Sequence, residues 1–151
     1  MNVAKVLETK GDGKVLTIPP SVSLREFSKK ACACNVGALL VMGPAGETLG
    51  IISERDVFRQ VSRGADLDRT AVSDVMTKGV VFVAPTDDVY KAMDLMVKQS
   101  VRHLPVMAGG VLHGFITVRD IMRALHQAEE NDIVYLIRHL QESMAAEHTS
   151  L

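Results

Sequence analysis

The sequence predicts an α+β fold, an α/β sandwich of two pseudo-symmetric β-α-β-β-α repeats followed by an extra C-terminal helix. A seven-residue pattern of glycine, two apolar residues, Ser or Thr, a variable residue, Arg and Asp occurs at 50–56 and again at 114–120. The segments before each copy repeat in the same order, which indicates a duplicated unit. An apolar stripe at helical spacing after the second copy predicts one more helix.

The first repeat is expected to contain three strands and two helices, with residues 1–14 as a leader into it. A brief apolar run at 15–18 ends at a Pro-Pro pair, which cannot continue a helix. Apolar residues then recur every three or four positions over 24–34, as on one face of a helix capped by Ser21 or Ser23. The remaining segments are a strand at 38–42, a returning strand at 49–52 and a helix from Asp56 to Val61.

The second repeat restates this order after a polar linker at 62–69. Its first strand is expected at 80–83 before a proline, its first helix carries apolar residues from Val89, and its middle strand spans 101–107. The second hairpin turn is one residue shorter than the first, which brings the two signature stretches to equivalent places. The expected boundaries are 1–65 for the first repeat, 66–127 for the second, and 128–151 for a C-terminal helix and tail.

The C-terminal region is expected to form two helical pieces. The helix opened by Asp120 runs through Leu125, and an unrepeated helix over 129–140 follows it. That helix carries an apolar stripe which must cover either the repeats or a second copy of the chain. The stripe consists of Ile133, Leu136, Ile137 and Leu140.

The repeated signature suggests a site for an anion and a sugar. Ser53 or Thr117 lies where a helix is capped, and Asp56 or Asp120 lies in the first turn, where the helix dipole favours a negative charge. A carboxylate at that place can accept two hydrogen bonds from a ribose diol. The alternative is a capping box in which hydroxyl and carboxylate satisfy backbone N–H groups and nothing else. Repetition at two matching places favours the binding site.

Composition excludes several classes of function. The formal net charge is −1 with both signs interspersed, so no field attracts nucleic acid or an anionic membrane. Aromatic residues make up 4% of the chain, with no tryptophan, so stacking platforms for single strands are absent. Apolar runs are short and the first residues lack the core of a signal peptide. We expect a soluble cytoplasmic protein that binds neither nucleic acid nor membrane.

The sulfur-containing residues are assigned no chemistry. Cys32 and Cys34 would point roughly 200° apart on a helix, which suits neither a disulfide nor a shared metal, so packing is expected. A metal or redox switch through these cysteines and the five histidines remains an alternative. Four methionines are expected to fill the core, namely Met93, Met96, Met107 and Met122.

The order of elements, the two signature stretches and a Val-x-Asp-Val-Met leader at 72–76 resemble a tandem cystathionine-beta-synthase (CBS) domain pair, also called a Bateman module. The resemblance covers about residues 1–127. It implies that the halves pair about a pseudo-twofold axis and leave two clefts for adenine nucleotides. It also implies that the modules dimerise.

The resemblance assigns roles to residues in each cleft. In one, Asp120 would take the ribose hydroxyls and Thr117 would lie near the ribose or phosphate, with Arg102, His103 and Arg119 as donors to the phosphates. The residues expected around the base are Lys14, Thr17, Ile18, Pro20, Gly37 and Ala38. The other cleft would use Ser53, Arg55, Asp56, Val83, Ala84 and Pro85.

These assignments have plainer alternatives. His103 can be a packed residue, and Arg55 and Arg119 can be solvated helix residues that pair with nearby carboxylates. The first repeat has Gly37 and Ala38 where the second has Arg102 and His103, so we expect the clefts to differ in affinity.

The function implied is a stand-alone regulatory module and not an enzyme, because neither a nucleophile with its base nor a phosphate-binding Gly-x4-Gly-Lys loop is found. AMP is the first expected ligand, with ADP, ATP, NAD(H) and S-adenosylmethionine also admitted. The module would sense energy or redox state and regulate an unknown partner or its own assembly as a homodimer or higher homo-oligomer. The alternative is a ligand-free structural or adaptor module, although the presence of both aspartates argues against it.

Overall fold

The computed structural model describes residues 1–11 and 15–148, with side chains as far as residue 138. The chain folds into two compact units, one formed by Lys14–Phe82 and the other by Met1–Gly13 together with Val83–Leu151. Among the described residues, no helix combines the length and the apolar composition that a membrane span requires.

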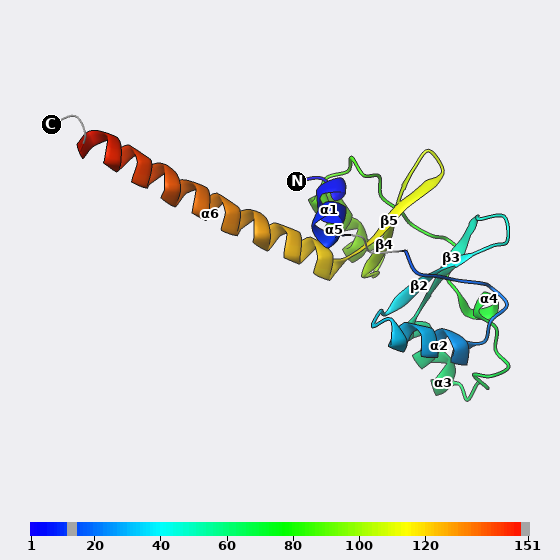
Figure 1. Cartoon of the computed structure of the whole chain (residues 1–151). Helices are drawn as coiled ribbons and strands as arrows, with labels where there is room; N and C mark the ends of the chain where they lie inside the picture. Colours follow the sequence, from blue (N-terminus) through cyan, green and yellow to red (C-terminus); the bar gives the residue numbers. More distant parts are fainter. Residues whose placement is uncertain (12–14, 149–151) are drawn as a thin grey trace. The chain divides into compact units, whose positions relative to one another are not determined.

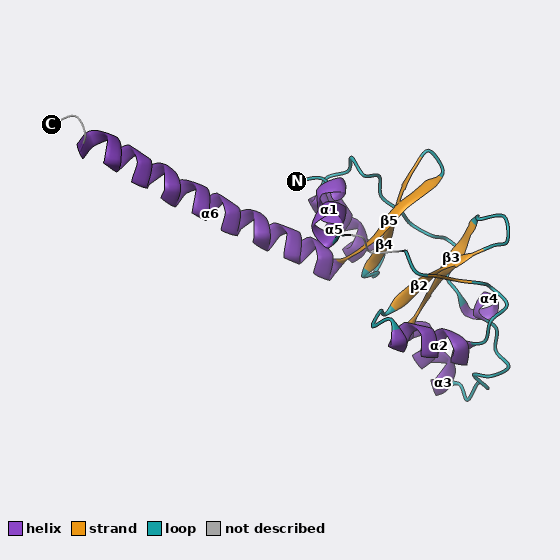
Figure 2. Ribbon diagram, in the orientation of Figure 1, coloured by secondary structure: helices purple, strands orange, loops and turns teal. Residues whose placement is uncertain are grey.

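The unit Lys14–Phe82 contains a three-stranded sheet in the order β1-β2-β3 (Figures 1 and 2). Strand β1 (Thr17–Ile18) runs parallel to β2 (Ala38–Met42), and β3 (Thr48–Ser53) returns antiparallel to β2. The helices of this unit are α2 (Leu24–Ala33), α3 (Glu54–Ser62) and α4 (Val72–Val75). The strands and helices predicted over 15–61 are therefore confirmed.

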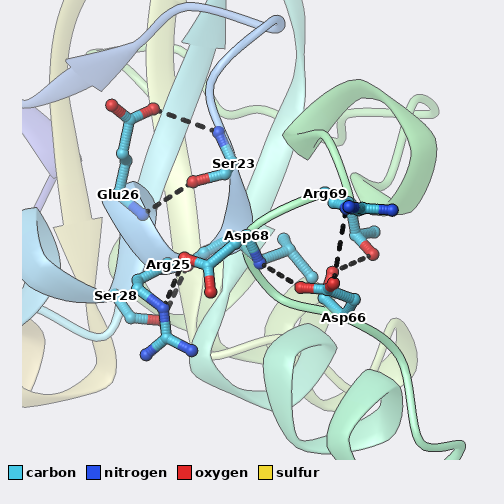
Figure 3. Close-up of polar contacts among 9 residues, drawn as sticks. Ser23, Arg25, Glu26, Ser28, Asp66, Asp68 and Arg69 are labelled. Carbon is cyan, nitrogen blue, oxygen red and sulfur yellow. Dashed lines mark hydrogen bonds and ion pairs between the residues drawn. The ribbon is translucent and has the colours of Figure 1, made fainter.

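Helix α2 shows how local sequence sets an element boundary. Ser23 Oγ accepts a hydrogen bond from the Glu26 N–H, and the Glu26 carboxylate accepts one from the Ser23 N–H, each at 3.2 Å. This capping box starts α2 at Leu24, shortly after the Pro-Pro pair (Figure 3). Arg25 Nε lies 2.6 Å from Asp68 Oδ1, which attaches the helix to the polar linker. The apolar face of α2 then packs into a buried cluster that contains Ile18, Leu24, Phe27, Ala31, Leu39, Val41, Ile52 and Val72.

The described residues of the second unit form a two-stranded sheet and three helices. Strand β4 (His103–Ala108) pairs antiparallel with β5 (Val111–Thr117), and a register shift follows Val106 as one follows Val41 in the first sheet. The helices are α1 (Val3–Lys10), α5 (Val89–Lys98) and α6 (Val118–His148). Its core is also aliphatic, with Val3, Val6, Val83, Val89, Ala92, Met96, Leu104, Val106, Ile116, Ile121 and Ala124 buried.

Helix α1 precedes the first repeat in sequence but packs with the second repeat. The Val3 N–H donates to the Asp87 carbonyl and the Ala4 N–H to the Pro85 carbonyl, both at 2.8 Å. In addition, α1 packs on β5 and α6. The segment that reads as a leader into the first repeat is thus a helix belonging to the other compact unit.

Helix α4 makes the equivalent exchange in the opposite direction. It precedes the second repeat in sequence, yet the Val72 N–H donates to the Val22 carbonyl at 2.8 Å and the Ser73 N–H to the Pro20 carbonyl at 2.9 Å. Each unit is therefore one repeat core completed by the leading helix of the other repeat. The boundaries at 65 and 127 stay a prediction about the sequence repeats, and the compact units divide the chain differently because the leaders are exchanged.

Two element predictions were wrong in detail. Residues 80–83 form no strand, since only Val83 pairs, in an isolated parallel bridge with Val106, and Phe82 is 57% exposed. The C-terminal pieces are one continuous helix, α6, because residues 126–128 contain no helix breaker and carry the hydrogen-bond ladder through.

The predicted packing of some sulfur-containing side chains was also wrong. Cys32 and Cys34 are free and exposed, Cys32 in the last turn of α2 and Cys34 at its C-cap, where the helix ends. Met96 is buried as expected, but Met122 is 59% exposed. The outward position of Met122 marks the start of an exposed face on α6.

Candidate functional site

The first signature forms a corner between β3 and α3. Asp56 is 7% exposed, and its Oδ2 accepts hydrogen bonds from the Ser53 N–H at 2.8 Å and the Ser53 hydroxyl at 3.1 Å. Arg59 Nη1 lies 3.7 Å from Asp56 Oδ1. The Glu54 N–H donates to the Gly37 carbonyl at 2.9 Å, which ties the start of the helix to the start of β2.

The second signature forms the same corner between β5 and α6. Asp120 is 8% exposed, and its Oδ2 accepts from the Thr117 N–H and the Thr117 hydroxyl, each at 2.9 Å. The Asp120 N–H donates back to Thr117 Oγ1 at 3.1 Å. The Val118 N–H donates to the Arg102 carbonyl at 3.2 Å, as Glu54 does to Gly37 in the other unit. Both corners therefore share the two bonds from the Ser or Thr to the carboxylate and the bond from the helix start to the neighbouring strand.

Both corners contain the capping arrangement that the sequence left open as the alternative. The capping bonds engage Oδ2 of each aspartate. A carboxylate has two oxygens and about four lone-pair directions, so one oxygen can hold the helix while the other accepts from a ligand. Capping and diol binding are compatible, and the capping bonds fix the orientation that a diol would meet.

Lys10 distinguishes the two corners. Its Nζ lies 3.0 Å from Asp120 Oδ2 and 2.7 Å from the Phe115 carbonyl oxygen, so the last residue of α1 clamps the end of β5 to the start of α6. Burial raises the pKa of Asp120, but the Lys10 ammonium and the hydroxyl and N–H of Thr117 outweigh it and hold that pKa below its ordinary value. The carboxylate is therefore ionised at neutral pH.

Lys10 was missed as a site residue. The signal was available, since Val3, Val6, Leu7 and Lys10 follow the spacing of one helical face. Such a helix packs its apolar residues inward and brings the lysine to the edge of the buried face, where its stem is covered and its ammonium finds a carboxylate. The segment was interpreted only as a leader, so this geometry was not anticipated.

We predict that Lys10→Met lowers the free energy of unfolding by about 1–3 kcal/mol at pH 7, because a largely buried carboxylate loses its cation and a carbonyl loses its donor. A lowered pKa contributes stability above the unfolded-state value near 4, and that contribution is lost as pH falls through the folded-state value. The loss should therefore be smaller at pH 3.5 than at pH 7 in urea titrations.

The matched control is Lys5→Met on the same helix. Lys5 pairs with Glu8 at 2.9 Å, but both side chains are more than 60% exposed, with values of 62% and 66%. That substitution should cost less than about 0.5 kcal/mol. Equal losses for the two variants, or a loss at Lys10 that does not change with pH, would show that the ion pair does not hold Asp120.

The structure brings several other predicted residues next to a signature. Register pairs Ala38 with Ser53, and His103 with Thr117. The His103 ring stacks on Phe115 with centroids 5.7 Å apart and an interplanar angle of 14°. His103 is therefore packed against a neighbour, as the plainer alternative expected. Arg119 is exposed on the first turn of α6.

The remaining predicted contacts lie elsewhere in the two units. The Thr17 carbonyl accepts from Lys30 Nζ at 2.6 Å, and the Pro85 carbonyl is engaged by α1 as described above. Val83 is buried, and the Ala84 N–H donates to Asp87 Oδ2 at 2.8 Å. Lys14 lies outside the described residues. In the described part of the chain, no three His, Cys, Asp or Glu side chains are arranged to hold a metal ion.

Comparison with known proteins decides the family. A model of the CBS domain matches residues 72–127. The mitochondrial CBS domain-containing protein CBSX3 of Arabidopsis thaliana is 30% identical over 147 residues, which cover 92% of this chain and 71% of that protein. This chain belongs to the CBS domain family.

Other proteins are similar to this chain over comparable lengths. An uncharacterized 17.7 kDa protein of Acidianus ambivalens is 36% identical over 113 residues, covering 74% of this chain and 68% of its own. The crystal structure of a CBS-domain protein from Agrobacterium tumefaciens has a TM-score of 0.77 at 34% identity, covering 82% of this chain and 92% of that one. A CBS domain protein from Pyrobaculum aerophilum complexed with AMP shares the fold, with a TM-score of 0.71 at 24% identity over 80% of this chain and 89% of its own. The predicted α+β architecture of paired CBS repeats is confirmed.

Proposed function

We propose that this CBS chain binds adenine nucleotides, AMP first, and acts in the cytoplasm as a sensor of energy or redox state. The observation that carries the proposal is the pair of buried aspartates, Asp56 and Asp120, each oriented by a Ser or Thr at a helix start. A fixed carboxylate beside a helix N-terminus suits a sugar diol on one side and a phosphate on the other. The AMP complex of the Pyrobaculum protein makes AMP the first ligand to test.

The sites at Asp56 and Asp120 are expected to bind nucleotide with different affinities. Arg102 precedes and His103 begins the strand beside Asp120, whereas Gly37 and Ala38 occupy the equivalent places beside Asp56. Guanidinium and imidazole groups add donors for phosphate oxygens that Gly and Ala lack. We therefore expect the tighter site, and any preference for NAD(H) over AMP, at Asp120.

The other predicted contacts stay proposals. Thr17, Ile18 and Pro20 would contribute around the base of a nucleotide at Asp120, together with Lys14, Gly37 and Ala38. Ser53, Arg55, Val83, Ala84 and Pro85 would contribute at Asp56. Binding by variants of these residues tests each assignment separately.

The nucleotide would act by changing a partner or the assembly of the chain itself. CBS domains are generally regulatory modules, which supports a role without catalysis. A hexameric CBS-CP12 protein from bloom-forming cyanobacteria, 27% identical with a TM-score of 0.70 over 81% of this chain and 69% of its own, is an assembled relative of this fold. We propose a homodimer or higher homo-oligomer that regulates an as yet unidentified protein.

Calorimetry and thermal unfolding with AMP and NADH test the proposal. A ligand that binds only the folded chain stabilises it by about 2.7 kcal/mol at a concentration a hundredfold above Kd, so AMP should raise the melting temperature by several degrees. Adenosine and inorganic phosphate separate the contributions of sugar and charge. If AMP, ADP, ATP, NADH and S-adenosylmethionine all give no heat and no thermal shift, the ligand-free adaptor is favoured instead.

A further inference from the structure

The carboxylate of Asp120 has one engaged oxygen and one open oxygen. Within the described residues, its hydrogen bonds and its ion pair all end on Oδ2, from the Thr117 N–H, the Thr117 hydroxyl and Lys10 Nζ. Oδ1 accepts none of these bonds, and no fully buried side-chain oxygen of the described residues lacks a partner. Oδ1 therefore reaches the surface of a residue that is otherwise only 8% exposed. A hydroxyl group from outside can bind there.

The ammonium of Lys10 is also only partly engaged. A lysine head group has three N–H donors. In the described part of the chain, one donates to Asp120 Oδ2 at 3.0 Å and one to the Phe115 carbonyl at 2.7 Å. With 27% of its side chain exposed, Lys10 has the third donor available to a group that approaches from solvent.

An open acceptor and an open donor thus lie side by side at this corner. The two carboxylate oxygens share one carbon, so an oxygen atom bound at Oδ1 lies within reach of an ammonium bound at Oδ2. A hydroxyl group suits this pair because it donates one hydrogen bond and accepts others. A phosphate suits it less, because it has no hydrogen to donate to Oδ1 and is repelled by the charge of the carboxylate. The pair therefore favours a sugar hydroxyl.

The corner at Asp56 has a different arrangement. Its ion pair comes from Arg59, one turn further along the same helix, with Nη1 at 3.7 Å from Asp56 Oδ1. The cation thus stands at the oxygen that Asp120 keeps open, on a side chain that is 60% exposed. Helix α4, the exchanged leading helix of that unit, contains no lysine. Lys10 therefore gives the Asp120 corner a donor that the Asp56 corner does not receive from its own leading helix.

We propose that Lys10 is a ligand-binding residue of the Asp120 site and donates its third N–H to the ribose hydroxyl that donates to Asp120 Oδ1. The contact rests on the nucleotide binding proposed above and deepens it, because it makes Lys10 a determinant of sugar specificity. Ribose recognition at Asp120 then requires Lys10, whereas ribose recognition at Asp56 does not. Selectivity for ribose over deoxyribose should accordingly be greater at Asp120.

Isothermal titration of the Asp56→Ala chain with AMP, 2′-deoxy-AMP and 3′-deoxy-AMP measures the Asp120 site alone. Adding Lys10→Met should weaken AMP binding about tenfold, because a hydrogen bond from a charged donor is lost. The analogue that lacks the bonded hydroxyl never makes this contact, so its affinity should change less than about twofold. A purely structural role for Lys10 would instead weaken AMP and both analogues by the same factor.

Two controls accompany this titration. Lys5→Met removes a lysine from the exposed side of the same helix and should leave all three affinities within about twofold. Circular dichroism at the titration temperature confirms that each chain is folded. If Lys10→Met is not folded, Lys10→Gln takes its place, because its amide can still donate to a neighbouring carbonyl.

Adenosine tests whether Lys10 binds the sugar or the phosphate. Lys10→Met should weaken adenosine by the same factor as AMP, because the proposed contact is to the ribose. A loss confined to AMP would place Lys10 on the phosphate and overturn the proposal.

Failure of the Lys10 contact is distinguishable from failure of nucleotide binding. If the Asp56→Ala chain binds AMP and Lys10→Met leaves the ratio of AMP to deoxy-AMP affinities unchanged, the contact is wrong and the nucleotide site stands. If neither the wild-type chain nor the Asp56→Ala chain binds AMP, the nucleotide proposal fails and the Lys10 contact fails with it.

Discussion

Asp120→Ala is expected to weaken AMP binding at one site about ten- to a hundredfold, because the ribose diol loses a charged hydrogen-bond acceptor. This corresponds to about 1.5–3 kcal/mol of binding free energy. Asp120 is suited to that role because Thr117 fixes its direction and Lys10 keeps it ionised. Asp56→Ala should have the same effect on the other, weaker site. Calorimetry of each variant with AMP gives the two affinities separately.

The controls separate binding from folding. Asp120→Ala also removes a helix cap and leaves Lys10 without its carboxylate, so the chain should be less stable and must be titrated well below its melting temperature. Asp88→Ala is the matched control because it also removes a helix cap. Asp88 caps α5 by accepting a 2.8 Å hydrogen bond from the Tyr90 N–H, and it lies outside both signatures. It should lower stability by about 1 kcal/mol and leave AMP binding unchanged. AMP binding that survives both signature substitutions would locate the nucleotide elsewhere on the chain.

Sequence reasoning succeeded where a local pattern determines a local structure. The Pro-Pro stop and Ser23 determine where α2 begins, and the continuous apolar run predicted β2 with its bounds at Ala38 and Met42. The duplicated signature was sufficient to predict two equivalent strand-to-helix corners. These features need only neighbours in the sequence, so one chain without relatives reveals them.

The exchange of leading helices could not be predicted in the same way. Helix α1 satisfies its first N–H groups at Pro85 and Asp87, and α4 uses Pro20 and Val22, so each choice of carbonyl is a tertiary one. The same apolar spacing in α1 is compatible with packing on either repeat. The spacing does place Lys10 at the edge of the apolar face of α1, but its pairing with Asp120 could not be predicted because the two residues are far apart in the sequence.

The continuity of α6 shows a different limit. Sequence periodicity indicated two helical pieces because the apolar face changes sides between Ala124 and Ile133. A helix that docks on one side and exposes an apolar surface on the other is read as two helices when each piece is expected to face one core. The change of face separates the part of α6 that packs on its compact unit, at Ile121 and Ala124, from the exposed part that begins at Ile133.

Gly50→Ala is expected to destabilise the unit Lys14–Phe82 by about 1–3 kcal/mol. A Cβ at this buried glycine would lie 2.7 Å from the Thr77 carbonyl oxygen and 2.8 Å from Met76 Sδ. That carbonyl accepts a hydrogen bond from the Ile51 N–H at 3.0 Å, and the Thr77 N–H donates back to Ile51 at 2.9 Å. The added methyl group must push the backbone after α4 away from β3 and lengthen this pair of bonds. Urea unfolding of the variant measures the loss.

The equivalent substitution Gly114→Ala should cost less, although its nearest contact is shorter. A Cβ there would lie 2.6 Å from Leu7 Cδ2, and its other close contacts are also with the Leu7 side chain. Leu7 is only partly buried, so its side chain can change rotamer while α1 keeps its backbone bonds. In both units a glycine is required at this place because the exchanged leading segment comes close to it, Leu7 of α1 at Gly114 and the two residues after α4 at Gly50. In one unit the obstacle is backbone and in the other it is a movable side chain. If Gly114→Ala proves as costly as Gly50→Ala, the leading helix is held more rigidly on β5 than these contacts indicate.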